Sequence, residues 1–158
     1  MATPWMIELK RVDWDAYDCY CGGRGHVGDY LAQLIQARSE AEMAGASLEG
    51  HVEDEAGLAP VAAPAVGVIM AAFQEDLAPV VRQDLMLTLW RVVLGASEEP
   101  LADEVYPKVR DGIWALYKEA AQGDTESALE ILEYVERDTG RFAAFKKALQ
   151  SRLDKRAR

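Results

Sequence analysis

The side chains best suited to metal chemistry are two cysteines and two histidines, all in the first third of the chain. They are Cys19, Cys21, His26 and His51, and the sequence contains no other cysteine or histidine. Two thiolates and two imidazoles can hold zinc tetrahedrally in a structural role. The Cys-Tyr-Cys spacing is shorter than the usual C-x₂₋₄-C pattern, and the two histidines stand much farther apart than in a zinc finger. Because cysteine is often simply a buried apolar residue, we expect no metal here and keep zinc as the alternative.

Other motifs that carry chemistry are incomplete. The segment Gly22-Gly23-Arg24-Gly25 precedes a helix, as phosphate-binding loops do, but it lacks the Lys-Ser/Thr of a P-loop and a preceding strand, so we expect a tight turn. The run Glu53-Asp54-Glu55 lacks the alternating ligand spacing of a calcium loop, which favours a solvated turn. No Ser–His–Asp or Cys–His arrangement is supported by spacing. We therefore expect no enzyme and no cofactor, with an unrecognised helical active site as a remote alternative.

The length and composition indicate one globular domain. The chain has 158 residues, of which 50% are hydrophobic and 28% charged. No apolar run approaches the ~20 residues that cross a bilayer, and no basic segment followed by an apolar one begins the chain. Two cysteines do not form a disulfide framework, so we expect a cytoplasmic protein.

The charge is divided unequally along the chain. The net charge is −10, yet residues 141–158 contain seven basic residues against Asp154 alone, a balance of +6. Residues 1–140 therefore contain 10 basic and 26 acidic residues, a balance of −16. We call residues 1–140 the acidic body; a region with this charge repels nucleic acid and attracts basic protein surfaces. A need for solubility alone would also explain the negative charge. The basic end complements the dipole of a last helix.

Apolar residues recur every three or four positions, and this spacing predicts helices throughout. The expected helices cover about 26–38, 39–52, 60–73, 79–94, 102–121, 125–135 and 140–155. Ser39 and Glu42 form a capping box at the start of the second. Two apolar stripes on 79–94 predict that this helix lies at the centre of the core. Before them, residues 1–25 form a cap rich in aromatic residues and glycine, expected to cover one end of the core with Trp5, Trp14, Tyr17 and Tyr20.

Successive helices pair into units of similar length. The units 26–52, 60–94 and 102–138 begin 34 and 42 residues apart, close to the ~40–47 residues of HEAT and armadillo repeats. The middle unit has a proline in its first helix, Pro64, an acidic turn, Glu75-Asp76, and Val81-Arg82 in its second helix. An ion pair between Asp76 and Arg82 would fix how units stack.

This middle unit resembles a HEAT repeat, and residues 14–95 are similar to bacterial HEAT-like immunity proteins found beside polymorphic toxins. The third unit departs from the pattern because it lacks the Asp and Val-Arg motif. The resemblance implies an all-α fold in one domain, 1–158: a right-handed α-α superhelix of about three HEAT-like helix pairs followed by the C-terminal helix. A plain helical bundle is the alternative.

The resemblance also implies a function. We expect a non-catalytic protein that neutralises a cognate toxin by occluding it, and the acidic body suits a toxin with a basic surface, such as a nuclease. We expect the partner-binding residues on helix faces that point away from the core: Gln83, Trp90, Glu130, Glu133, Tyr134 and Arg137. A general helical-repeat adaptor is the alternative. DNA glycosylases share the fold class, but the acidic body opposes a nucleic-acid partner, and no membrane partner is expected.

Overall fold

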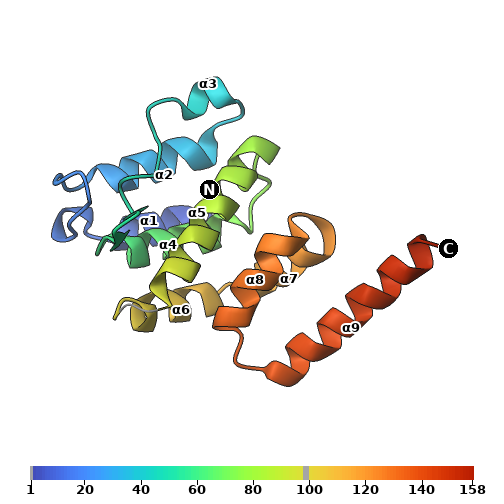
Figure 1. Ribbon diagram of the computed structural model, residues 1–158. Helices are drawn as coiled ribbons and strands as arrows, with labels where there is room; N and C mark the ends of the chain where they lie inside the picture. Colours follow the sequence, from blue (N-terminus) through green and yellow to red (C-terminus); the bar gives the residue numbers. More distant parts are fainter. Residues whose placement is uncertain (1, 98–99) are drawn as a thin grey trace.

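The computed structural model describes residues 2–97 and 100–158, and helices make up most of them (Figure 1). The helices are α1 (Pro4–Arg11), the 3₁₀ helix η1 (Trp14–Ala16), α2 (His26–Gln36), α3 (Glu40–Met43), α4 (Ala62–Ala72), α5 (Pro79–Ala96), α6 (Ala102–Arg110), α7 (Ile113–Gln122), α8 (Thr125–Val135) and α9 (Thr139–Arg156). Two short strands, β1 (Glu53–Asp54) and β2 (Gly57–Leu58), form an antiparallel hairpin. The expected all-α class is confirmed. None of the helices in the described residues is long and apolar enough to cross a membrane.

Helix α4 lies at the centre of the core. Nine of its eleven residues are buried, and α1, α2, α5 and α6 pack around it. The sequence instead predicted the central position for α5. Both apolar stripes of α5 are buried except at Trp90, but Gln83 and Leu87 on its other side are exposed. The reason is compositional: α4 contains no charged residue, whereas α5 contains three.

The N-terminal segment packs three of its aromatic side chains in or against the core. Pro4 begins α1 at a position where its missing N–H costs nothing. Trp5 is buried, and Trp14 and Tyr17 are half-buried against the core. The indole N–H of Trp14 donates to the carbonyl of Leu9 at 3.0 Å. Of the four aromatic residues, only Tyr20 is largely outside, at 37% exposed.

The predicted helix over 39–52 is wrong beyond its first turn. Its capping box is only half formed: Ser39 Oγ accepts from the Glu42 amide at 3.4 Å, but the Glu42 carboxylate accepts from the Arg38 amide at 2.6 Å and not from that of Ser39. Helix α3 nevertheless ends at Met43, because Gly45 adopts a φ of +83°, in the left-handed region that reverses the chain. The chain then continues as turns and the β1–β2 hairpin.

The predicted helix over 102–121 is two helices, α6 and α7, separated at Asp111-Gly112. Pro107 has no backbone N–H to donate to the preceding turn, which weakens the helix there. Gly112 lies at the point where α4 packs against this segment. A Cβ atom at Gly112 would lie 3.1 Å from Cε of Met70. The third expected unit therefore contains three helices, α6, α7 and α8.

Arg82 links the α4–α5 turn to the next unit, although not through Asp76 as expected. Its guanidinium donates to the carbonyl of Glu75 at 3.2 Å and pairs with the carboxylate of Glu119 on α7 at 3.3 Å. The Glu119 side chain is only 11% exposed. A single side chain thus joins α5, the preceding turn and α7.

Candidate metal centre and acidic groove

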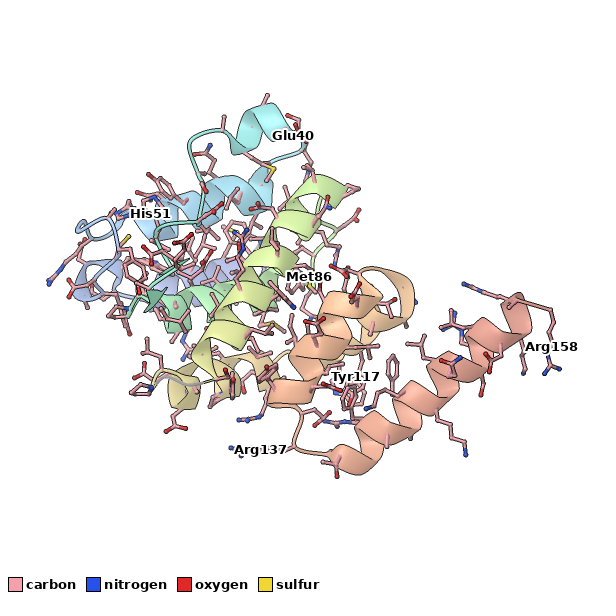
Figure 2. All side chains as sticks on the ribbon, viewed as in Figure 1. Glu40, His51, Met86, Tyr117, Arg137 and Arg158 are labelled. Atoms are coloured by element: carbon pink, nitrogen blue, oxygen red, sulfur yellow. The ribbon has the colours of Figure 1, made fainter. Side chains whose placement is uncertain are left out.

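The structure brings the four potential zinc ligands of the sequence together. Cys19 and Cys21 lie on the loop after η1, and His26 is the first residue of α2. His51, labelled in Figure 2, lies in the turn before β1. One donor atom from each residue lies within 4.8 Å of those of the other three. We call these four residues the metal centre.

The spacing of the donor atoms fits a common ion. The Cys19 and Cys21 sulfurs are 3.3 Å apart, and His26 Nε2 lies 3.3 Å from each of them. His51 Nδ1 lies 3.2 Å from the Cys19 sulfur and 3.0 Å from His26 Nε2. Tetrahedral zinc, with bonds of about 2.3 Å to sulfur and about 2.0–2.1 Å to nitrogen, needs separations of about 3.3–3.8 Å. Five of the six separations are within a few tenths of an ångström of these values. The sixth, between the Cys21 sulfur and the His51 nitrogen, lies within 4.8 Å, so these two residues would have to approach each other to complete the site.

The glycine-rich segment after Cys21 forms the expected tight turn, and this turn shapes the metal centre. The amide of Gly22 donates to the carbonyl of Cys19 at 3.0 Å, which folds Cys21 back toward Cys19. The amide of Gly23 donates to the Cys21 sulfur at 3.3 Å, a contact that stabilises a thiolate. A Cβ atom at Gly23 would lie 3.2 Å from His26 Cε1 and 3.3 Å from that sulfur, so only glycine fits without displacing a ligand.

His51 is held from its backbone and from its ring. Its carbonyl accepts from the amide of Tyr20, between the two cysteines, at 3.3 Å, and its own amide donates to Leu48 at 3.1 Å. The ring of Tyr30 meets the His26 and His51 rings edge-on, with centroids 5.3 and 5.2 Å away. These contacts orient both imidazoles before any ion binds.

Burial adjusts two of the ligands in opposite senses. Burial raises the pKa of the Cys19 thiol; the backbone amide of Cys21 opposes this rise, and the Cys21 side chain adds to it. Burial also lowers the pKa of His51, with a further contribution from His26. Neutral imidazole is the form that binds metal, and a nearby dication would supply the positive charge that a buried thiolate lacks. Because all four positions are protein atoms, the arrangement suits a structural ion and leaves no open position for a substrate.

The residues predicted to bind a partner lie on α5, α8 and the turn after α8. Gln83, Glu133 and Arg137 are exposed, and Tyr134 is 44% exposed. Trp90 is half-buried and donates from Nε1 to the Glu130 carboxylate at 2.6 Å, which joins α5 to α8. Glu133 lies 3.9 Å from Lys146 of α9.

A groove beside Trp90 was not predicted from the sequence. It lies between α5 and the hairpin segment and is lined by Trp90, Arg91, Leu94, Glu49, Gly50, Glu53, Asp54 and Glu55. We call it the acidic groove, because its lining contains four carboxylates and one guanidinium. Arg91 lies 3.5 Å from both Glu49 and Glu53. Burial raises the pKa of Glu53, an effect that Arg91 opposes, so this carboxylate is poorly solvated and short of positive charge.

The apolar part of the groove continues along α5. Leu87, Trp90 and Leu94 follow one another at helical spacing, and Leu87 is 44% exposed while the other two are half-buried. This spacing is visible in the sequence. The position of the four carboxylates that line the groove is not visible in the sequence, because it depends on the hairpin that replaces the expected helix.

Comparisons with protein-family models, with curated proteins and with solved structures find no match.

Proposed function

We propose that this protein binds one zinc ion through Cys19, Cys21, His26 and His51, and that the ion has a structural role. The observation that carries the proposal is the convergence of two sulfur and two nitrogen donors within 4.8 Å. No other cysteine or histidine exists in the chain, so every one of them takes part. Soft sulfur with imidazole is the donor set that selects zinc over magnesium or calcium.

The ion would add a connection between two segments that apolar packing and backbone hydrogen bonds already join to the core. Residues 17–25 and 44–61 contain no α-helix, and the ligands tie both of them to the first turn of α2. His51 also lies between Glu49 and Glu53, so the same ion would fix one wall of the acidic groove.

The test is the metal content of protein purified without a histidine tag and without chelators. We expect one zinc ion per chain by elemental analysis, retained on dialysis and lost in the double variant Cys19→Ser/Cys21→Ser. Arg24→Gln is the matched control, because Arg24 is exposed on the same loop, pairs with Asp18 and offers no ligand. Replacement by cobalt should produce thiolate-to-metal absorption, which here can come only from these two cysteines.

Two results would overturn the zinc proposal. One is less than about half an equivalent of zinc after reconstitution and dialysis of the wild-type protein. The other is full zinc retention by the cysteine double variant, which would assign the ion to different residues.

We also propose, as a second function, that the chain is a protein-binding domain of the HEAT-like immunity type, with its helix pairs stacked in a right-handed superhelix. The observation that favours it is the acidic groove with the apolar stripe beside it. Aromatic and aliphatic side chains ringed by charge are typical of binding hot spots. A basic toxin would complement the carboxylates, whereas an adaptor would bind two proteins and inhibit neither.

Rescue by co-expression separates immunity from adaptor function. Cells that produce a toxin encoded beside this gene should survive when this protein is present. Trp90→Ala should weaken protection, whereas Gln122→Ala, exposed on α7 and outside the predicted binding residues, is the control. Failure to protect would remove the basis of the immunity proposal and leave the zinc proposal untouched.

A further inference from the structure

The C-terminal half of α9 extends away from the rest of the protein. Figure 1 shows α9 leaving the end of α8 and running outward, and Figure 2 places Arg158 at its far end. Every residue from Ser151 to Arg158 is exposed, and Leu153 is 51% exposed. We call residues 146–158 the basic arm, because they contain six basic residues and one acidic residue.

Only the first two turns of α9 are firmly attached. Phe142 is buried, and the Phe145 ring meets Tyr117 edge-on with centroids 4.9 Å apart. Arg141 pairs with the buried Glu136 carboxylate at 2.8 Å. These contacts fix the direction in which the arm leaves, so the arm cannot fold back onto α5 of its own chain without breaking them.

The arm has the composition of a docking helix. Leu149 and Leu153 are one turn apart and continue the stripe of Phe142 and Phe145. Basic residues flank this stripe: Lys146, Lys147, Arg152, Lys155 and Arg156. An isolated, mostly polar helix end of this length gains little stability by itself, which favours a bound state in which the two leucines are covered.

The acidic groove of the same protein has the complementary composition. It is lined by Trp90 and Leu94 beside four carboxylates and a single arginine, and the exposed Leu87 continues its apolar stripe along α5. Two arms would repel each other because both are basic, but an arm and a groove attract.

We propose that the basic arm of one copy docks in the acidic groove of a second copy, so that the protein self-associates through this contact. The leucines of the arm cover the stripe on α5, and the lysines and arginines meet the carboxylates of the hairpin segment. The contact uses the face assigned above to a toxin, so a partner with a basic surface competes with the arm. The proposal does not require a toxin, and the proposed zinc ion would act on it only by fixing the groove wall on either side of His51.

The test uses the full-length, zinc-loaded protein in sedimentation equilibrium at low and high salt. We expect concentration-dependent association that weakens as salt is added. Two double variants, Lys147→Glu/Lys155→Glu on the arm and Glu49→Lys/Glu55→Lys at the groove rim, should each weaken self-association by roughly tenfold or more. The first lowers the net charge of the arm from +5 to +1, and the second changes that of the groove from −3 to +1. Asp103→Lys/Glu104→Lys, exposed on α6, is the control for the change in net charge.

Mixing the two reversed variants is the decisive step. In the mixture the unaltered arm of the groove variant meets the unaltered groove of the arm variant, so heterodimers should form at concentrations where neither variant associates alone. A wild-type protein that stays monomeric throughout would overturn the proposal, as would association that both reversed variants retain. An arm that binds only anionic vesicles or nucleic acid, with the protein itself monomeric, would overturn it as well.

Discussion

Removal of zinc should destabilise the protein by an amount that the chain geometry determines. The metal centre joins Cys19 to His51, which are 32 residues apart in the sequence. A crosslink that closes a loop of this length lowers the conformational entropy of the unfolded chain and so stabilises the folded state by about 3–4 kcal/mol. Mass action gives a similar figure, because free zinc at about a hundred times its dissociation constant stabilises by about 2.7 kcal/mol. For a domain of this size, 3 kcal/mol corresponds to a fall in Tm of about 6–12 °C.

Thermal unfolding followed by circular dichroism, with and without a chelator, measures this fall. His51→Ala should reproduce it in zinc, and addition of the chelator should then change nothing further. Arg24→Gln should behave as the wild type in both conditions. Equal Tm values for zinc-loaded and metal-free wild-type protein would refute the reasoning, since an ion bound to four ligands in the native state alone must stabilise that state.

Three further outcomes follow from individual contacts. Gly23→Ala should weaken zinc affinity by roughly tenfold, measured by competition with a chelator, because its Cβ crowds His26 and the Cys21 sulfur while its amide is kept. Arg82→Leu should lower the free energy of unfolding, measured by urea denaturation, by about 2 kcal/mol, because the Glu119 side chain, 11% exposed, loses its cation. This loss should be smaller when Glu119→Gln is also present, and the control Arg11→Ala, in an exposed ion pair, should cost at most about 0.5 kcal/mol. Burial opposes ionisation of Glu136, but hydrogen bonds from Tyr117, the Asp138 amide and Arg141 outweigh it and hold the pKa of Glu136 below its ordinary value of 4.5. The ionised Glu136 therefore stabilises the folded state above pH 4.5, and this contribution is lost as the pH falls through the lower pKa of the folded protein. Glu136→Gln should make the free energy of unfolding depend less on acid pH, and an unchanged pH profile would contradict the assignment.

The sequence predicted the helices wherever the helical period was uninterrupted. Val27, Leu31 and Leu34 share the stripe expected of them and are buried, and Gly123 and Asp124 separate α7 from α8 as expected. The failures occur where a local backbone preference or a tertiary contact overrides the period. Gly45 ends α3 although Leu48 and Val52 continue the apolar spacing, and both remain buried without a helix. Gly112 divides a helix because Met70 packs against it.

The metal centre could not be predicted from spacing, because its spacing is unlike that of known zinc motifs. Motif rules describe ligands on one compact unit, whereas His51 reaches the cysteines only after α2 and α3 have reversed the chain. The residue types were a sufficient signal, since all four belong to one donor set and no others exist in the chain. The four residues are far apart in the sequence, which favoured the prediction of no metal, but the fold brings their donor atoms together.

The position of the metal centre follows from where helix packing is weakest. Helices α4 to α8 bury long apolar faces against one another. The segments 17–25 and 44–61 contain no α-helix, and although Leu48 and Val52 are buried, these segments resemble a small scaffold attached to a larger one. Small scaffolds of this kind are stable when a metal or disulfide closes them. Because these same segments supply the carboxylate wall of the acidic groove, an ion at their junction would set the shape of the surface on which both proposed docking events depend.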